Sequence, residues 1–314
     1  MRELSEEALA RLSSVGTAFV GYPRFNSLLR EIEICHRESA FTHEPISMLI
    51  TGESGVGKTT LIKQYAKQHP RQEEAERSRI PVMVTSVPVP ADIRGLAAQM
   101  LRALGAHLVE TGSAAYRTER LIQMIAACGV ELIFLDEFQH LVERATPNKI
   151  RAVSDWVKTL INETGTPIVL LGMPSAASLV QENDQLPRRF RFKRSFEPFH
   201  WHYDREEFRL TIDRLDQALP FELPSALGGA ALLPRIFLAC RGRFGFLNNL
   251  LYEAARHAIS DASARIEVHH LSRAYDLVLV ADAPNAANPF DLSEGRVESW
   301  LEQLMATTTK ETKC

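Results

Sequence analysis

Four residues near the start of the chain have the types and the spacing that phosphate binding requires. Gly52, Gly57, Lys58 and Thr59 fit the pattern Gly-x-x-x-x-Gly-Lys-Thr without a mismatch. Glycines let backbone N–H groups converge on an anion because no Cβ intervenes, and a helix N-terminus adds partial positive charge. Lys58 is expected to neutralise the β- and γ-phosphates of ATP, and the Thr59 hydroxyl to complete the shell of Mg²⁺. The predicted nucleotide contacts are Gly52, Glu53, Ser54, Gly55, Val56, Gly57, Lys58, Thr59 and Thr60.

A pair of carboxylates, Asp136 and Glu137, ends an apolar run further along the chain. Taken alone, the pair could equally be two acids that end a strand at the protein surface. Downstream of a phosphate-binding loop, it is typical of the acids that hold Mg²⁺ and support hydrolysis. Asp136 is expected to orient Mg²⁺, and Glu137 to accept a proton from the attacking water or to hold that water in line.

Residues 186–194 carry five cations among nine residues, including Arg188 and Arg189. One interpretation is a solvated basic face. The other is a set of arginines that face phosphate, because a planar guanidinium donates two hydrogen bonds suited to a γ-phosphate. An arginine that reaches the nucleotide of a neighbouring subunit would couple hydrolysis to assembly. Phe190 and Phe192 alternate with cations, which predicts a strand.

Buried strands and helices must position these groups, and the apolar pattern predicts both. Strands are predicted at residues 48–50, 80–85, 131–137 and 168–171, and helices at 93–104, 116–128 and 148–163. Continuous apolar strands that alternate with helices indicate a parallel sheet with helices on both faces. Residues 67–79 are almost entirely polar and predict a helix end and a solvated loop. Helical periodicity dominates from Trp201 onward.

These patterns divide the chain into four parts. They are an N-terminal helical segment (1–45), a nucleotide-binding core (46–200), a helical lid (201–283) and a linker with a C-terminal tail (284–314).

Composition limits the partners and the location. The net charge of −3 offers no general attraction to nucleic acid or to an anionic membrane, so a polyanion needs a local basic patch. No apolar run reaches the ~18 residues of a membrane span, the N-terminus lacks the apolar stretch of a signal peptide, and the four scattered cysteines predict free thiols. We therefore expect a cytoplasmic protein. The histidine pairs at 200/202 and 269/270 lack nearby cysteine or carboxylate partners, so no protein-ligated metal site is predicted.

The order of these motifs resembles that of AAA+ ATPases and, within them, the transposition regulators TniB and TnsC. The resemblance spans roughly residues 20–290. Residues 49–59 and 133–141 are generic to AAA+ proteins. The motifs that point to the family are Val-Leu-Leu-Gly-Met-Pro at 169–174, Leu-Pro-Arg-Arg-Phe at 186–190, Ala-Leu-Pro-Phe-Glu-Leu-Pro-Ser-Ala-Leu at 218–227 and Asn-Pro-Phe at 288–290.

The resemblance implies an α/β AAA+ fold with a small helical lid, and ATP-dependent oligomers, in rings or filaments, on double-stranded target DNA. It also implies that the protein engages a transposase, often beside a TniQ-type target-selection protein. By matching motifs, Arg189 is the first candidate for an arginine finger and Arg188 the second. The DNA-binding candidates by analogy are Arg94, Arg117 and Arg120, with ordinary solvated arginines as the alternative for each.

Two positions depart from the AAA+ pattern. Met173 stands where a polar sensor residue is expected after the fourth strand, with Ser175 as the nearest substitute. In the lid, Arg243 is the candidate for the sensor arginine. Slow hydrolysis is the expected result, which suits a switch that controls assembly. The alternative is an AAA+ motor, such as a helicase loader or remodeller. The sequence carries no acceptor-binding signature that would favour a small-molecule kinase.

Overall fold

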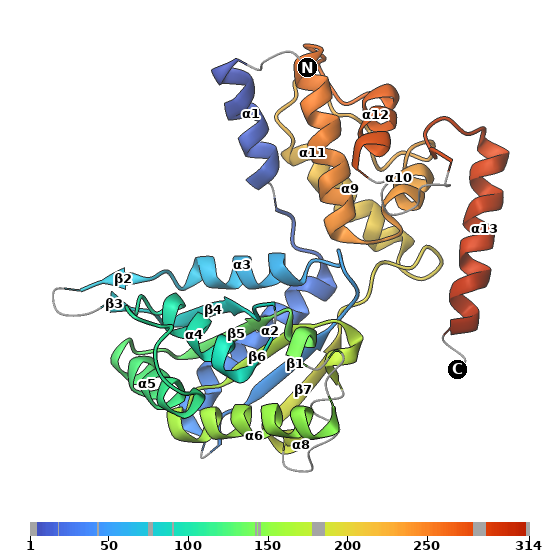
Figure 1. The fold of residues 1–314 in the computed structure, drawn as a ribbon. Helices are drawn as coiled ribbons and strands as arrows, with labels where there is room; N and C mark the ends of the chain where they lie inside the picture. Colours follow the sequence, from blue (N-terminus) through green and yellow to red (C-terminus); the bar gives the residue numbers. More distant parts are fainter. Residues whose placement is uncertain are drawn as a thin grey trace. The chain divides into compact units, whose positions relative to one another are not determined.

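The computed structural model describes residues 5–17, 19–42, 44–74, 78–89, 91–141, 143, 146–177, 186–278 and 287–311. The chain divides into two compact units. One unit, Arg24–Glu197, contains a five-stranded sheet, and the other joins Met1–Pro23 to Pro198–Cys314 and consists of helices and loops where it is described (Figure 1).

All five strands of the large sheet run parallel. In order across the sheet they are β4 (Val82–Ser86), β5 (Leu132–Asp136), β6 (Ile168–Gly172), β1 (Ser47–Thr51) and β7 (Phe190–Ser195). Because every neighbouring pair is parallel, the carboxyl ends of the strands meet at one edge. The predicted parallel sheet is confirmed, and so is the strand predicted from Phe190 and Phe192.

The helices of this unit have local start and stop signals. They are α2 (Pro23–Glu38), η1 (Ser39–Phe41), α3 (Lys58–Gln68), α4 (Ile93–Ala103), α5 (Ala114–Ala127), η2 (Phe138–Leu141), α6 (Pro147–Thr164), η3 (Pro174–Ala176) and α8 (Leu186–Arg189). Asp92 accepts the Gly95 N–H at the start of α4, and Ser113 accepts the Tyr116 N–H at the start of α5. Gly165, with φ of 66°, ends α6 in the left-handed conformation that favours glycine.

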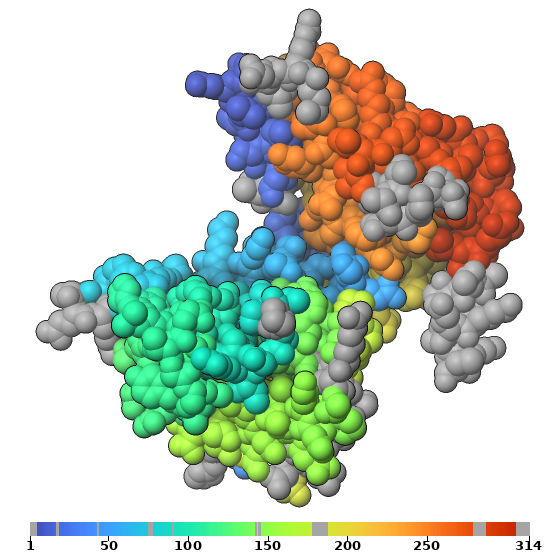
Figure 2. Space-filling view, viewed as in Figure 1, coloured from blue at the N-terminus to red at the C-terminus, as the bar shows by residue number. Residues whose placement is uncertain are grey.

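Helices cover both faces of the sheet. On one face, Met83, Ile133 and Leu170 pack in a single buried cluster with apolar side chains of α4, α5 and α6. On the other face, the ring of Tyr65 in α3 lies 5.7 Å from the ring of Phe134 in β5. In the space-filling view, side chains largely hide the strands of this unit (Figure 2). Burial from both sides explains why the strands are continuous apolar runs in the sequence.

Residues 67–79 differ from the predicted helix end and loop. Two short strands, β2 (Gln72–Glu73) and β3 (Ser78–Arg79), form an antiparallel pair there. The guanidinium of Arg71 donates to Glu73 over 2.5 Å and to Ser78 over 2.7 Å. Polar contacts rather than apolar burial organise this hairpin, so no apolar period marked it in the sequence.

The second unit is helical, as the periodicity after Trp201 predicted. Its helices are α1 (Glu6–Thr17), α9 (Arg205–Ala218), α10 (Leu233–Cys240), α11 (Phe244–Ser260), α12 (Val268–Val278) and α13 (Glu294–Glu311). α1 lies beside α11 (Figure 1), where Gly16 faces the ring of Tyr252, and Arg11 donates to the carbonyl of Pro220 over 2.8 Å. The first helix of the chain is therefore part of a unit formed mostly by the last third of it.

Two further expectations concern cysteines and membrane spans. Cys35, Cys128 and Cys240 are buried and not in disulfides within the described residues, and Cys314 lies outside those residues. Among the helices of the described residues, none combines the length and the apolar character that crossing a bilayer requires. Residues 284–286 of the predicted linker also lie outside the described residues.

Candidate nucleotide-binding site

The loop between β1 and α3 has the backbone that a phosphate-binding loop needs. Gly55 and Gly57 have φ of 80° and 111°, and Gly57 directly precedes the first turn of α3. Gly52 lies close to the chain after β7, since a Cβ there would be 2.5 Å from the carbonyl oxygen of Phe196. The side chain of Val56 is buried beneath the loop. The remaining predicted contacts, Glu53, Ser54 and Thr60, are exposed or half-buried.

Lys58 begins α3 and points back along the loop. Its ammonium donates to the carbonyls of Gly52 and Glu53 over 2.7 and 2.9 Å, and the residue is 7% exposed. Burial lowers the pKa of Lys58, while the nearby carboxylates of Glu137 and Asp136 raise it. An ammonium held among carbonyls and partly desolvated is prepared to receive a more strongly charged acceptor, such as a phosphate.

Thr59 and Asp136 meet although 77 positions separate them in the chain. The Thr59 hydroxyl donates to Asp136 Oδ2 over 2.9 Å, and the N–H of Glu137 donates to the other carboxylate oxygen over 2.9 Å. Asp136 is 4% exposed, and burial raises its pKa against the opposing effect of these two hydrogen bonds. A hydroxyl beside a carboxylate fits Mg²⁺, which prefers oxygen ligands.

Glu137 has an unusual backbone and a bonded side chain. Its φ is 55°, in the left-handed region that non-glycine residues seldom adopt. The amide nitrogen of Gln139 donates to Glu137 Oε2, and His140 Nε2 lies 3.8 Å from the same oxygen. Gln139 was not among the residues predicted from the sequence. The only available signal was a polar amide two positions after the second carboxylate.

The segment after β6 contains the predicted sensor position. The backbone N–H of Met173 donates to Gln139 Oε1 over 3.0 Å. The hydroxyl of Ser175 lies 3.5 Å from Glu143 Oε1, on an exposed part of η3. The polar group that contacts this segment from within the site is thus Gln139.

The two arginines of α8 differ in their surroundings. Arg189 donates to Asn162 Oδ1 from two guanidinium nitrogens, at 2.7 and 3.0 Å, and lies 3.8 Å from a carboxylate oxygen of Glu44. Arg188 is exposed, and in the described part of the chain its side chain makes no hydrogen bond or ion pair. Within the same described residues, neither arginine makes a hydrogen bond or ion pair with Asp136, and neither shares an acceptor with Lys58.

The three DNA-binding candidates also differ. Arg117 is 2% exposed, and its guanidinium donates to the carbonyls of Thr111, Arg94 and Glu110. Arg120 donates to the carbonyls of His107 and Leu108. Both therefore hold the loop between α4 and α5, whereas the side chain of Arg94 is exposed at the start of α4.

Arg243, the candidate lid arginine, belongs to the helical unit. It directly precedes α11, and its guanidinium lies 5.4 Å from the ring centroid of Phe246.

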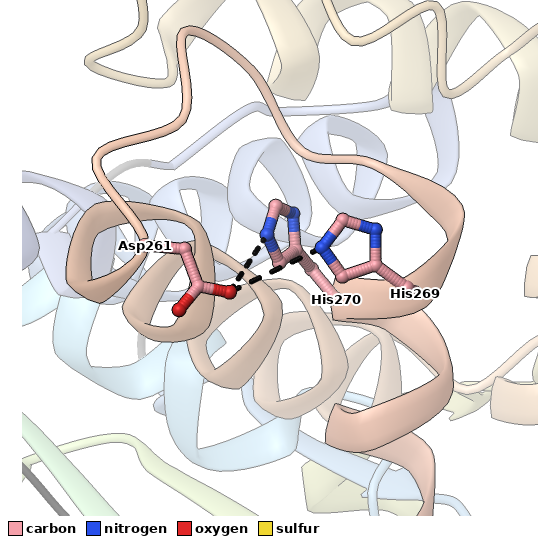
Figure 3. Close-up of side chains that lie close together, drawn as sticks. All are labelled: Asp261, His269 and His270. Atoms are coloured by element: carbon pink, nitrogen blue, oxygen red, sulfur yellow. Dashed lines mark ion pairs between the residues drawn. The ribbon is translucent and has the colours of Figure 1, made fainter.

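Another group of ligand-type side chains lies in the helical unit. Ligand atoms of Asp261, His269 and His270 lie within 4.8 Å of one another (Figure 3). The N–H of Glu267 donates to His270 Nδ1 over 2.9 Å, so the proton of the neutral ring is on Nε2. That Nε2–H faces Asp261 Oδ2 at 3.4 Å, and Arg273 donates to the same oxygen over 2.9 Å. A protonated nitrogen and a guanidinium around one carboxylate oxygen fit an ion-pair network better than a metal site.

The sequence matches one family of known proteins. The family model described as "Bacterial TniB protein" matches residues 14–201, which is more than half of the chain and includes the phosphate-binding loop, the two carboxylates and the arginine pair. This confirms the resemblance that the motifs indicated. No curated protein matches the sequence.

Several solved structures are similar in fold. Cdc6p of Pyrobaculum aerophilum has a TM-score of 0.60 and 14% identity, over 85% of this chain and 71% of that one. The Aeropyrum pernix Orc1 protein, in complex with DNA, has a TM-score of 0.58 and 18% identity, over 82% of this chain and 66% of that one. Domain III of the Thermotoga maritima replication initiation protein DnaA has a TM-score of 0.52 and 16% identity, over 88% of this chain and 99% of that one. At these identities the likeness shows the fold alone, and it confirms the predicted AAA+ fold.

Proposed function

The chain belongs to the TniB family, and on that premise we propose that it is an ATP-dependent, DNA-binding regulator of transposition. In this proposal, ATP-bound subunits assemble as a ring or filament on double-stranded target DNA in the cytoplasm. The assembly engages a transposase, beside a TniQ-type target-selection protein. Hydrolysis dismantles the assembly, so the nucleotide acts as a switch.

The hydrogen bond between Thr59 and Asp136 carries the ATPase part of this proposal. It joins the phosphate-binding loop to the end of β5, at the edge where the strands of the parallel sheet end. Lys58 would bind the β- and γ-phosphates after leaving the carbonyls of Gly52 and Glu53. Thr59 and Asp136 would hold Mg²⁺, which when bound supplies positive charge to the phosphate oxygens.

Glu137 is proposed to activate or position the water that attacks the γ-phosphate. The water oxygen forms a bond to the γ-phosphorus, and the bond from phosphorus to the β,γ-bridging oxygen breaks with its electron pair passing to ADP. Glu137 accepts the water proton or holds that water in line. Arg189, or Arg188 beside it, is the proposed contact with the nucleotide of a neighbouring subunit.

The remaining parts of the chain have proposed roles as well. Residues 201–283 serve as the lid, with Arg243 as its sensor arginine, and residues 46–200 as the nucleotide-binding core. The flanking parts, residues 1–45 and 284–314, include α1 and α13, which belong to the helical unit. DNA runs along the α4–α5 side of the core, where Arg94 offers an exposed cation and Arg117 and Arg120 hold the adjoining loop. The solved Orc1 structure in complex with DNA supports a DNA-binding use of this fold.

A pair of lysine variants tests the proposal. Lys58→Ala removes the main cation of the loop and should abolish ATP binding and ATP-dependent binding of linear duplex DNA. Lys63→Ala is the matched control, because Lys63 lies on the same helix and is exposed. Equilibrium binding of ATP and of duplex DNA by both variants measures the difference. ATP binding by Lys58→Ala at wild-type affinity would contradict the proposed site.

A further inference from the structure

The buried side chain of Gln139 connects two parts of the site that are distant in sequence. Gln139 is 3% exposed and belongs to η2, directly after the two carboxylates. Its Oε1 accepts the N–H of Met173 over 3.0 Å, and its Nε2 donates to Glu137 Oε2. A single amide therefore contacts both the proposed water-activating group and the position where a polar sensor was expected.

The contact with Met173 fixes the orientation of the Gln139 amide. A backbone N–H can only donate, so the amide atom that faces Met173 must be oxygen. The amide nitrogen then faces Glu137, where its N–H is complementary to an ionised carboxylate. Gln139 thus restrains the Glu137 carboxylate through a hydrogen bond whose direction is set by the backbone N–H of Met173, directly after β6.

Two backbone features accommodate this arrangement. A Cβ at position 172 would lie 2.8 Å from Gln139 Oε1 and 3.0 Å from the Cβ of Ala176, so glycine permits the close approach of β6 to the amide. Glu137 itself adopts φ of 55°, a strained conformation that a non-glycine residue keeps only where the surrounding structure imposes it. A strained residue beside a buried amide with both ends bonded points to a position set by function.

We propose that Gln139 is a positioning residue for ATP hydrolysis, which fixes the Glu137 carboxylate and supplies the polar contact that the Met173 side chain lacks. This inference rests on the proposed ATPase function. It makes the orientation of Glu137 depend on the segment that follows β6.

Two substitutions separate the two ends of the amide. Gln139→Glu keeps an acceptor for the Met173 N–H but removes the donor to Glu137. Gln139→Leu removes both. Gln68→Glu and Gln68→Leu are matched controls at the exposed end of α3. For each variant we would measure kcat and KM for Mg²⁺–ATP in the presence of duplex DNA, the affinity for ATP, and thermal unfolding. The ratio of the variant kcat to the wild-type kcat is then compared across pH.

Gln139→Glu should lower kcat by about 100-fold at neutral and higher pH, as for a misplaced catalytic group, while KM and ATP affinity stay near wild type. As pH falls, the carboxyl introduced at 139 takes up a proton and can again donate a hydrogen bond to Glu137, so the ratio to wild type rises. Asp136, Lys58 and His140 lie near the same carboxylate, so Gln139→Leu, which adds no charge, is the comparison that isolates the effect of the introduced carboxyl. Gln139→Leu should show a deficit that does not change with pH.

Wild-type kcat in both Gln139 variants would overturn the inference, and so would a loss that follows a lower melting temperature or weaker ATP binding. Glu137→Gln distinguishes this failure from failure of the proposed function. If hydrolysis depends on Glu137 but not on Gln139, only the inference fails. If the wild-type protein does not hydrolyse ATP, or if Glu137→Gln hydrolyses it normally, the proposed function fails and the inference with it.

Discussion

Arg189 is bonded within its own chain to Asn162, whose Oδ1 accepts two hydrogen bonds from the guanidinium, whereas the adjacent Arg188 is exposed. The two arginines were predicted from one motif, yet they are not equivalent. Arg189 has to leave Asn162 before it can reach another subunit, while Arg188 is already available. Assembly and hydrolysis can therefore depend on the two residues in different ways.

Alanine substitution should separate these roles. Arg188→Ala should lower hydrolysis in ATP-dependent oligomers, by up to about 10³-fold for a full arginine finger, without changing the melting temperature. Arg189→Ala should lower hydrolysis and also the melting temperature, because the bond to Asn162 is lost. ATPase assays and thermal unfolding measure both effects.

Arg191→Ala is the control, since Arg191 is exposed on β7. Mixing either arginine variant with Glu137→Gln protein should restore part of the turnover, because each oligomer then contains complete sites between unlike subunits. Without recovery in mixed oligomers that assemble normally, neither arginine acts between subunits.

Glu137→Gln distinguishes a switch from a motor. The substitution keeps the site for nucleotide and Mg²⁺ but removes the group that activates water. For a switch, the variant should remain bound to DNA with ATP and still recruit the transposase. Retention on duplex DNA and activity in a reconstituted transposition assay measure this. A stably bound but inactive variant would favour an AAA+ motor.

The raised pKa of Asp136 should make the stability of the metal-free protein and the binding of Mg²⁺ depend on pH in opposite directions. Because burial raises the folded pKa above the unfolded one, Asp136 contributes stability to the metal-free protein at low pH, and this contribution is lost as pH rises through the folded pKa. Mg²⁺ needs the carboxylate, so its binding should weaken as pH falls toward the raised pKa.

Asp136→Asn tests both effects, the one on the stability of the metal-free protein and the one on Mg²⁺ binding. At neutral pH it should raise the melting temperature of the metal-free protein and abolish the extra stabilisation by Mg²⁺–ATP. A variant that keeps the Mg²⁺ effect would show that Asp136 does not hold the ion. Thermal unfolding with and without Mg²⁺–ATP, across pH, supplies the measurement.

Arg94 and Arg117 should differ in how they affect DNA binding. Arg94→Ala should weaken ATP-dependent binding to any duplex and reduce its salt dependence, because an exposed phosphate contact is lost. Arg117→Ala should instead destabilise the unit by roughly 1.5–3 kcal/mol, because buried charged hydrogen bonds to three carbonyls are lost. DNA titrations at several salt concentrations and denaturant unfolding compare them. Equal loss of DNA affinity without destabilisation in both would contradict the bracing role of Arg117.

The sheet and the phosphate-binding loop could be predicted because their signals are local. Glycine spacing, the adjacent Lys-Thr and continuous apolar strands each lie within a few residues. The β2–β3 hairpin was missed because Arg71, rather than an apolar pattern, ties its two exposed strands together.

Other features depend on contacts between distant residues and leave little trace in sequence. Gln139 contacts Met173, 34 positions away, so the residue type alone gave no reason to select it. Arg94 and Arg117 look alike in sequence, and only burial among carbonyls separates them. The same holds for Arg188 and Arg189, which differ by a bond to Asn162.

The pairing of α1 with α11 also sets an order of events during synthesis. α1 is made well before its partner surface: Arg11 and Pro220, which share a hydrogen bond, are 209 positions apart. At typical translation speeds, roughly 10–40 s pass before that surface is made. During this time the apolar side chains of Leu12 and Val15, which are buried in the folded protein, are uncovered. Meanwhile the α/β unit, whose sequence lies between α1 and α11, can fold by itself. Until α11 is made, the growing chain therefore carries an amphipathic helix with its apolar face uncovered, and transiently exposed apolar surface of this kind favours aggregation.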